Sequence, residues 1–208
     1  MMQQETVKSS SSFTIASKVR DYMLLIKFSL SFMVVFSAVI SYLLAPNIVR
    51  YDWMMIMLLF IGGLLVTGSA NAVNQVVERD TDALMKRTAK RPIASGRMSP
   101  SEGWVFAAVS LIAGVFILYY YFNALSALMA FLSWFMYAFL YTPLKKVSSI
   151  SVLVGAIPGA FPCLIGWTAG QDDLSAGGGV ICDSVFLAVP AFLGDSLDCA
   201  QRLYKCRV

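Results

Sequence analysis

Long apolar runs constrain this chain more than any other feature of its sequence. Five of them are clear and a sixth is weaker; in order they cover residues 22–45, 53–73, 104–122, 124–141, 150–167 and 180–193. A helix rises about 1.5 Å per residue, so a run of about 20 apolar residues matches a bilayer core about 30 Å thick. Backbone polar groups inside a bilayer must pair within their own segment, which favours helices. We therefore predict an all-α, polytopic transmembrane helix bundle with five clear spans, and the mean hydropathy of +0.71 supports this class.

Lysine and arginine are distributed unevenly between these runs. Residues 1–20 carry three, six lie between Arg79 and Arg97, and Lys145 and Lys146 separate the fourth run from the fifth. Basic residues concentrate on the cytoplasmic side of a membrane. We therefore expect a flexible cytoplasmic tail over 1–20 and a cytoplasmic loop over 77–101, in a protein of the cell inner (plasma) membrane. The net charge of +4 reports this asymmetry and does not require a nucleic-acid partner.

Histidine and cysteine do not suggest a site. The chain has no histidine, so the commonest metal ligand and proton shuttle is missing. Its four cysteines show no C-x-x-C spacing and predict neither a zinc site nor a disulfide framework. Any chemistry must rest on carboxylates, amides, lysine, arginine and tyrosine.

Three oxygen-bearing side chains follow the second apolar run. Asn74, Glu78 and Asp82 are spaced i, i+4 and i+8, which on an α-helix places them on one face along about 12 Å. Like charges at this spacing repel, and a charge near the bilayer costs up to about 2.5–3.5 kcal/mol. A divalent cation would offset both costs, and Mg²⁺ takes one or two carboxylates together with phosphate oxygens. Asp80 lies off this face, so we expect it either just behind the ligands or in solvent.

The basic segment behind these residues suits a Mg²⁺–diphosphate held at the membrane surface, because arginine forks match phosphate oxygens. Two other interpretations remain open. A solvated helix end that follows the positive-inside rule would show the same basic residues. A transporter would use acidic residues to line an ion path, but its acids would sit in mid-membrane, not beside a basic loop.

Two long segments resemble, in order, motifs of the UbiA-type intramembrane prenyltransferases. They are "NQVVERDTDALMKRTAKRPIASGRMS" at 74–99 and "YTPLKKVSSISVLVGAIPGAFPCLIGW" at 141–167. Within the first, D-x-D-A-L-M-x-R-T-x-x-R-P is similar to the haem-farnesylating branch of that family. Glu78 departs from the aspartate usual in the family, and Ser29 stands where a K-x-R element would have its arginine after Lys27.

The resemblance implies a nine-helix prenyltransferase fold, of which residues 21–180 would be the N-terminal part. It implies Mg²⁺-dependent transfer of a farnesyl group from farnesyl diphosphate to a vinyl group of haem B, giving haem O. A quinone precursor or chlorophyllide is the alternative acceptor. Besides the lipid bilayer, haem A synthase or cytochrome oxidase assembly factors would be partners. Asn74, Glu78 and Asp82 would be the catalytic, metal-binding set, and the diphosphate-binding residues would be Lys27, Arg79, Arg87, Arg91, Tyr141 and Lys145.

The likeness fails after about residue 180. Codons can be chosen that encode residues 182–208 and that, when the same DNA is translated from its second nucleotide, give a different sequence without a stop codon. That second sequence contains the family motif W-Q-F-P-H-F and a D-Y pair. We therefore expect residues 181–208 to be an aberrant tail that is out of frame. Since a second carboxylate motif would then be missing, we expect the chain to be inactive alone.

Overall fold

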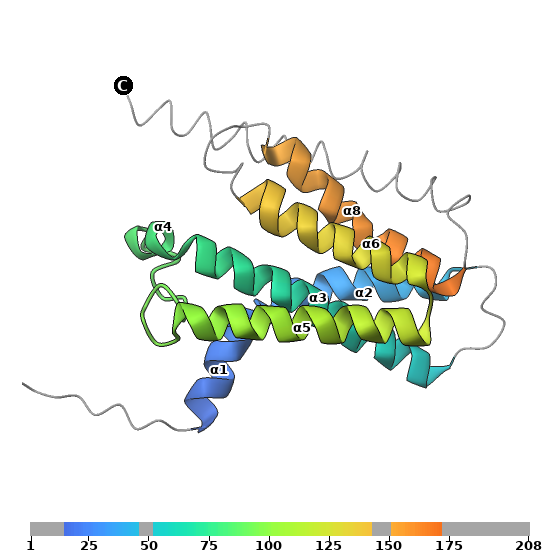
Figure 1. Ribbon diagram of the computed structural model, residues 1–208, viewed down its shortest axis with the longest axis horizontal. Helices are drawn as coiled ribbons and strands as arrows, with labels where there is room; N and C mark the ends of the chain where they lie inside the picture. The colour runs from blue at the N-terminus through green and yellow to red at the C-terminus, as the bar shows by residue number, and fades with distance from the viewer. Residues whose placement is uncertain (1–14, 46–51, 143–150, 172–208) are drawn as a thin grey trace, which may run out of the picture.

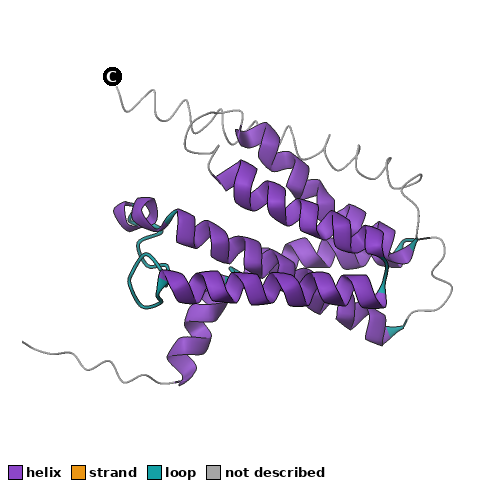
Figure 2. Cartoon of the chain, in the orientation of Figure 1, coloured by secondary structure: helices purple, strands orange, loops and turns teal. Residues whose placement is uncertain are grey.

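The computed structural model describes residues 15–45, 52–142 and 151–171, and all regular structure within these ranges is helical (Figure 2). The helices are α1 (Ile15–Leu25), α2 (Phe28–Leu43), α3 (Trp53–Val77), α4 (Arg79–Leu84), α5 (Pro100–Tyr121), α6 (Ala124–Phe135), the π-helix η1 (Met136–Tyr141) and α8 (Ser151–Gly170). The prediction of an all-α fold is confirmed. The predicted sixth run, the aberrant tail over 181–208 and most of the predicted N-terminal tail lie outside the described ranges.

The long helices form a bundle in which α3 and α5 run side by side and α6 packs on α8 (Figure 1). Helix α2 packs between α3 and α8. Within the described residues, three segments are long and apolar enough to cross a membrane, namely α3, α5 and the continuous stretch Ala124–Tyr141 formed by α6 and η1. The bent pair of α1 and α2 would be a fourth if it forms one span. Large apolar side chains such as Val109, Ile112 and Phe116 of α5 are exposed on the outside of the bundle, as a lipid-facing surface requires. The chain is a multi-pass membrane protein.

The first predicted span, over 22–45, is not one continuous helix. Helices α1 and α2 are bent by 55° at a short break, where Lys27 adopts a left-handed backbone conformation with φ 49°. The break frees backbone carbonyls that a continuous helix would pair. Two amide side chains of α3 take up that role: Gln75 Nε2 donates to the carbonyl oxygens of Leu24 (3.1 Å) and Leu25 (2.9 Å), and Asn71 Nδ2 donates to that of Ile26 (3.0 Å).

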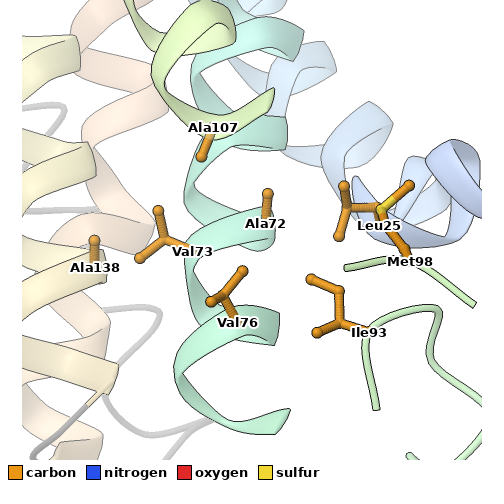
Figure 3. Close-up of a cluster of buried hydrophobic side chains, with 8 residues drawn as sticks. All are labelled: Leu25, Ala72, Val73, Val76, Ile93, Met98, Ala107 and Ala138. Atoms are coloured by element: carbon orange, nitrogen blue, oxygen red, sulfur yellow. The ribbon is translucent and has the colours of Figure 1, made fainter. Parts of the chain in front are cut away.

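One cluster of buried apolar side chains lies at the end of the bundle where α3 finishes. Figure 3 shows it to consist of Leu25, Ala72, Val73, Val76, Ile93, Met98, Ala107 and Ala138. Ile93 and Met98 belong to the segment 85–99 between α4 and α5, and they are only 5% and 2% exposed. Burying each such side chain contributes about 1.5–3 kcal/mol. The segment 85–99 is therefore packed onto the bundle.

Small residues allow the helices to approach closely, as is common in membrane bundles. A Cβ at Gly114 of α5 would lie 2.9 Å from the carbonyl oxygen of Gly62 in α3. A Cβ at Gly166 of α8 would collide with the carbonyl group of Ala38 in α2. Backbone cannot move aside as the end of a flexible side chain can, so the contact between α2 and α8 depends on a hydrogen at position 166.

We predict that Gly166→Ala lowers stability by about 1–3 kcal/mol, the usual cost of overpacking, because α2 and α8 must separate. The matched control is Gly159→Ala in the same helix, where an added Cβ meets no atom within 4 Å. The control should leave stability unchanged or raise it slightly, since alanine is the better helix former. Thermal unfolding of both variants in detergent measures the difference; equal midpoints would show that the close approach of α2 and α8 is not required.

Candidate functional site

The three oxygen-bearing residues predicted from the sequence come together at the end of α3. Asn74, Glu78 and Asp82 are 3%, 6% and 4% exposed, and Asn74 Nδ2 donates to Glu78 Oε2 at 3.2 Å. They do not lie on one helix, because α3 ends at Val77 and α4 begins at Arg79. The helical backbone hydrogen bonds nevertheless continue: the N–H of Glu78 donates to the carbonyl of Asn74 (3.0 Å), and the N–H of Asp82 donates to the carbonyl of Glu78 (2.8 Å), which keeps the side chains adjacent.

Arg91 brings the compensating positive charge. Its Nη1 forms an ion pair with Asp82 Oδ2 and lies 3.8 Å from Glu78 Oε2. The segment 85–99 returns the arginine to this position, and Thr88 Oγ1 donates to the carbonyl oxygen of Asp82 at 3.0 Å. Buried carboxylates are strongly destabilising without a partner. The segment that carries Arg91 is therefore part of the site.

Two ion pairs hold the surroundings of the segment in place. Arg97 Nε donates to Asp21 Oδ1 of α1 at 2.9 Å, and Asp21 is buried. Lys18 Nζ and Tyr22 Oη both donate to Glu102 Oε1 in the first turn of α5, at 3.0 and 2.8 Å. Helix α1 is thereby fixed both to the segment 85–99 and to α5.

Thr142, which directly follows η1, also contacts the cluster. Its hydroxyl has one proton, which it shares between the carbonyl oxygen of Tyr137 (2.9 Å) and the more distant Asn74 Oδ1 (3.3 Å). Tyr141, predicted to bind diphosphate, is partly buried next to this contact, and its ring stacks on Tyr137 with centroids 5.3 Å apart. The second predicted residue of this element, Lys145, lies outside the described ranges.

A buried polar stripe connects the site to the break in the first span. Asn71, Asn74, Gln75 and Glu78 are spaced i, i+3, i+4 and i+7 and are all buried. Lys27, predicted to bind diphosphate, sits partly buried at the break. The sequence interpretation missed Asn71 and Gln75, although their spacing from Asn74 and Glu78 was the available signal. Gln75 Oε1 has no hydrogen-bond partner within the part of the chain that the structure describes.

The remaining predicted residues are not drawn into this cluster. Arg79 Nε donates to Asp80 Oδ1 at 3.2 Å, and these side chains are 49% and 88% exposed. Arg87 is exposed as well. Of the predicted arginines, the structure thus places Arg91 on the carboxylates, while Asp80 points into solvent.

The donor set fits one kind of metal site. Across 15–45, 52–142 and 151–171 no group of three or more histidine, cysteine, aspartate or glutamate side chains could hold a metal ion alone. The cluster instead offers two carboxylates and one amide oxygen, all hard oxygen donors. Mg²⁺ commonly takes one or two carboxylates and completes its coordination with water and substrate phosphates. These residues fit Mg²⁺ that arrives with a phosphorylated ligand.

We predict that Gln75→Leu destabilises the protein by about 1–3 kcal/mol, because it leaves the freed carbonyl of Leu25 buried without its donor. Thr67→Val, in the same helix, is the control, since the Thr67 hydroxyl donates only within α3, to Gly63. Thermal unfolding and limited proteolysis near residue 27 provide the measurement. A Gln75→Leu protein as stable as the control would contradict the role given to this amide.

Comparison with known proteins places these features in context. The model of the UbiA prenyltransferase family matches residues 34–201. A protoheme IX farnesyltransferase from Flavobacterium johnsoniae is 42% identical over 172 residues, which cover 81% of this chain and 57% of that protein. Another from Cytophaga hutchinsonii is 44% identical over 154 residues, covering 74% of this chain and 54% of that protein. The chain spans little more than half the length of these relatives.

Two solved structures share the fold. One is a digeranylgeranylglyceryl phosphate synthase, with a TM-score of 0.74 and 20% identity over 83% of this chain and 60% of that one. The other is a UbiA homologue from Archaeoglobus fulgidus bound to DMAPP and Mg²⁺, with a TM-score of 0.72 and 14% identity over 85% of this chain and 62% of that one. At these identities the likeness concerns the fold alone.

Proposed function

The chain belongs to the UbiA prenyltransferase family, and we propose that the full-length protein, read from its gene in an intact frame, carries out Mg²⁺-dependent transfer of a farnesyl group from farnesyl diphosphate to a vinyl group of haem B, giving haem O. The observation that carries the proposal is the buried cluster of Asn74, Glu78 and Asp82 with Arg91 on its carboxylates. The relatives named protoheme IX farnesyltransferase support the acceptor. A quinone precursor or chlorophyllide is disfavoured by these names, and a prenyltransferase family favours the enzyme over a transporter.

Asn74, Glu78 and Asp82 would hold Mg²⁺ through their oxygen atoms. When bound, the ion supplies positive charge that stabilises the diphosphate leaving group as the allylic C–O bond breaks. Arg91, which lies beside both carboxylates, would donate hydrogen bonds to phosphate oxygens, for which its planar fork is suited. Lys27, Tyr141 and Lys145 complete the proposed diphosphate-binding set.

Burial of the cluster has a chemical consequence of its own. An allylic cation reacts with water as readily as with an acceptor, so a prenyl transferase must keep water away from the reacting carbon. The proposal requires such an environment at the end of α3, where the side chains of the cluster are 3–6% exposed. Electrostatic interactions are also stronger there than in water.

The orientation follows from the same proposal. The segment 77–101 and the N-terminus would face the cytoplasm of the inner membrane, where a soluble diphosphate is available. Besides lipid, the partners would be farnesyl diphosphate, haem B and the enzymes that consume haem O, such as haem A synthase or the cytochrome oxidase assembly system.

The test is haem extraction from cells that express the full-length protein from its gene. We expect a farnesylated haem, and a loss of about 10²–10³-fold when Asn74 and Asp82 are both changed to alanine, the scale of removing charge stabilisation from a transition state. Asp80→Asn is the control, because this exposed carboxylate lies two residues from Asp82 yet outside the cluster. Chelation of divalent cations should abolish formation and added Mg²⁺ should restore it. Product formation that survives the double substitution would refute the assignment.

A further inference from the structure

A buried hydroxyl just after η1 contacts the cluster of Asn74, Glu78 and Asp82 at the end of α3. Thr142 is 0% exposed and lies 68 residues along the chain from Asn74, yet its Oγ1 is 3.3 Å from Asn74 Oδ1. The proposed function gives Thr142 no role. A buried hydroxyl at this position must have a reason, since an apolar residue of the same shape would avoid the cost of burying it.

The π-helix explains how the hydroxyl reaches this position. In η1 the backbone N–H of Thr142 donates to the carbonyl of Tyr137, five residues earlier, and the hydroxyl donates to the same oxygen at 2.9 Å. A π-turn inserts an extra residue into a helix and thereby changes the face on which the following residue lies. Thr142 is held at the end of this turn, with its hydroxyl between Tyr137 and Asn74.

The contact also determines the orientation of the Asn74 amide. An asparagine side chain has one donor end and one acceptor end. Asn74 Nδ2 donates to Glu78 Oε2 at 3.2 Å, while Oδ1 lies 3.3 Å from Thr142 Oγ1, whose proton it shares with the Tyr137 carbonyl. Rotating the amide by 180° would place its carbonyl oxygen against the Glu78 carboxylate, which is repulsive. The hydroxyl and the carboxylate together leave one orientation, and Oδ1 keeps a second lone pair.

We propose that Thr142 is a positioning residue for the metal–diphosphate site: its hydroxyl orients the Asn74 amide so that Oδ1 is presented as a cation ligand. The inference rests on the proposed function, because it concerns the residues assigned there to Mg²⁺. It goes beyond that function in two ways. It assigns a role to the η1 turn, and it adds to the site a residue that binds neither metal nor substrate. Residues that support metal ligands in this way typically change metal affinity by about 10–100-fold.

The experiment uses the full-length protein and measures binding of Mn²⁺ in the presence of inorganic diphosphate, by the loss of the free-ion magnetic resonance signal. Thr142→Val keeps the shape and removes the donor. We expect its dissociation constant for Mn²⁺ to rise about tenfold, and Thr142→Ser to restore it to within about twofold. The KM for farnesyl diphosphate should rise in parallel, whereas the KM for the haem acceptor should not change.

Thr168 provides the matched control. It is also 0% exposed, and its hydroxyl donates to the Leu164 carbonyl and accepts from Ser126 Oγ, within a contact between α6 and α8 that involves no residue of the cluster. Thr168→Val should lower thermal stability about as much as Thr142→Val does, without weakening Mn²⁺ binding. If Thr142→Val does not accumulate in membranes, Thr142→Ala takes its place with the same expectation.

Three results would overturn the inference: unchanged Mn²⁺ binding in the Thr142 variant, failure of serine to restore it, or equal weakening by Thr168→Val. The proposed function can be refuted by a different result from the one that refutes the role of Thr142. Binding of Mn²⁺ and diphosphate that depends on Thr142, without any farnesylated haem, would reject the haem acceptor and leave the positioning role intact. A protein that binds no Mn²⁺ with diphosphate would reject both.

Discussion

The burial of two carboxylates at the end of α3 is the constraint on which the rest of this structure depends. Glu78 and Asp82 are buried, and buried carboxylates are strongly destabilising without a partner; Arg91 is that partner. To deliver that arginine, the segment 85–99 must turn back over the bundle. Its return buries Ile93 and Met98 against α3 and fixes Arg97 to Asp21. The need to pair two buried carboxylates with Arg91 thus explains why the segment 85–99 packs on α3 and why α1 is bound to that segment.

Two faces of helix α3 make different kinds of contact, one with α5 and the other with the break between α1 and α2. Gly62 and Ser69 face α5, where the close helix crossing and a 2.7 Å hydrogen bond from Ser69 to the Ala107 carbonyl replace bulky packing. The polar stripe that includes Asn71 and Gln75 faces the break in the first span. Since a freed carbonyl inside a bilayer has no water to bind, the break can exist only where another helix brings donors. The amides therefore permit an irregular backbone next to the site.

The sequence predicted the parts of the fold that depend on local pattern. Apolar run length was enough for the helices, and i, i+4, i+8 spacing was enough to bring Asn74, Glu78 and Asp82 together. It could not predict the break at Lys27, because the apolar run continues through that position and the compensating donors lie about 45 residues away on α3. Nor could it separate Arg91 from Arg79 and Arg87, since only the path of the loop does so. The contact of Thr142 depended on a π-turn, which has no sequence signature at this length.

Two departures from the usual family pattern make sense together in this structure. Ser29 is exposed, and the arginine that pairs with the carboxylates of the cluster is Arg91 of the 85–99 segment. Glu78 has one methylene more than aspartate, and it lies between the end of α3 and the start of α4. The longer side chain lets one carboxylate accept from Asn74 at 3.2 Å and remain 3.8 Å from Arg91. The carboxylate of an aspartate at this position would lie about 1.5 Å, the length of one C–C bond, farther from both Asn74 and Arg91. The glutamate therefore keeps its own carboxylate within 4 Å of Arg91, which also pairs with Asp82.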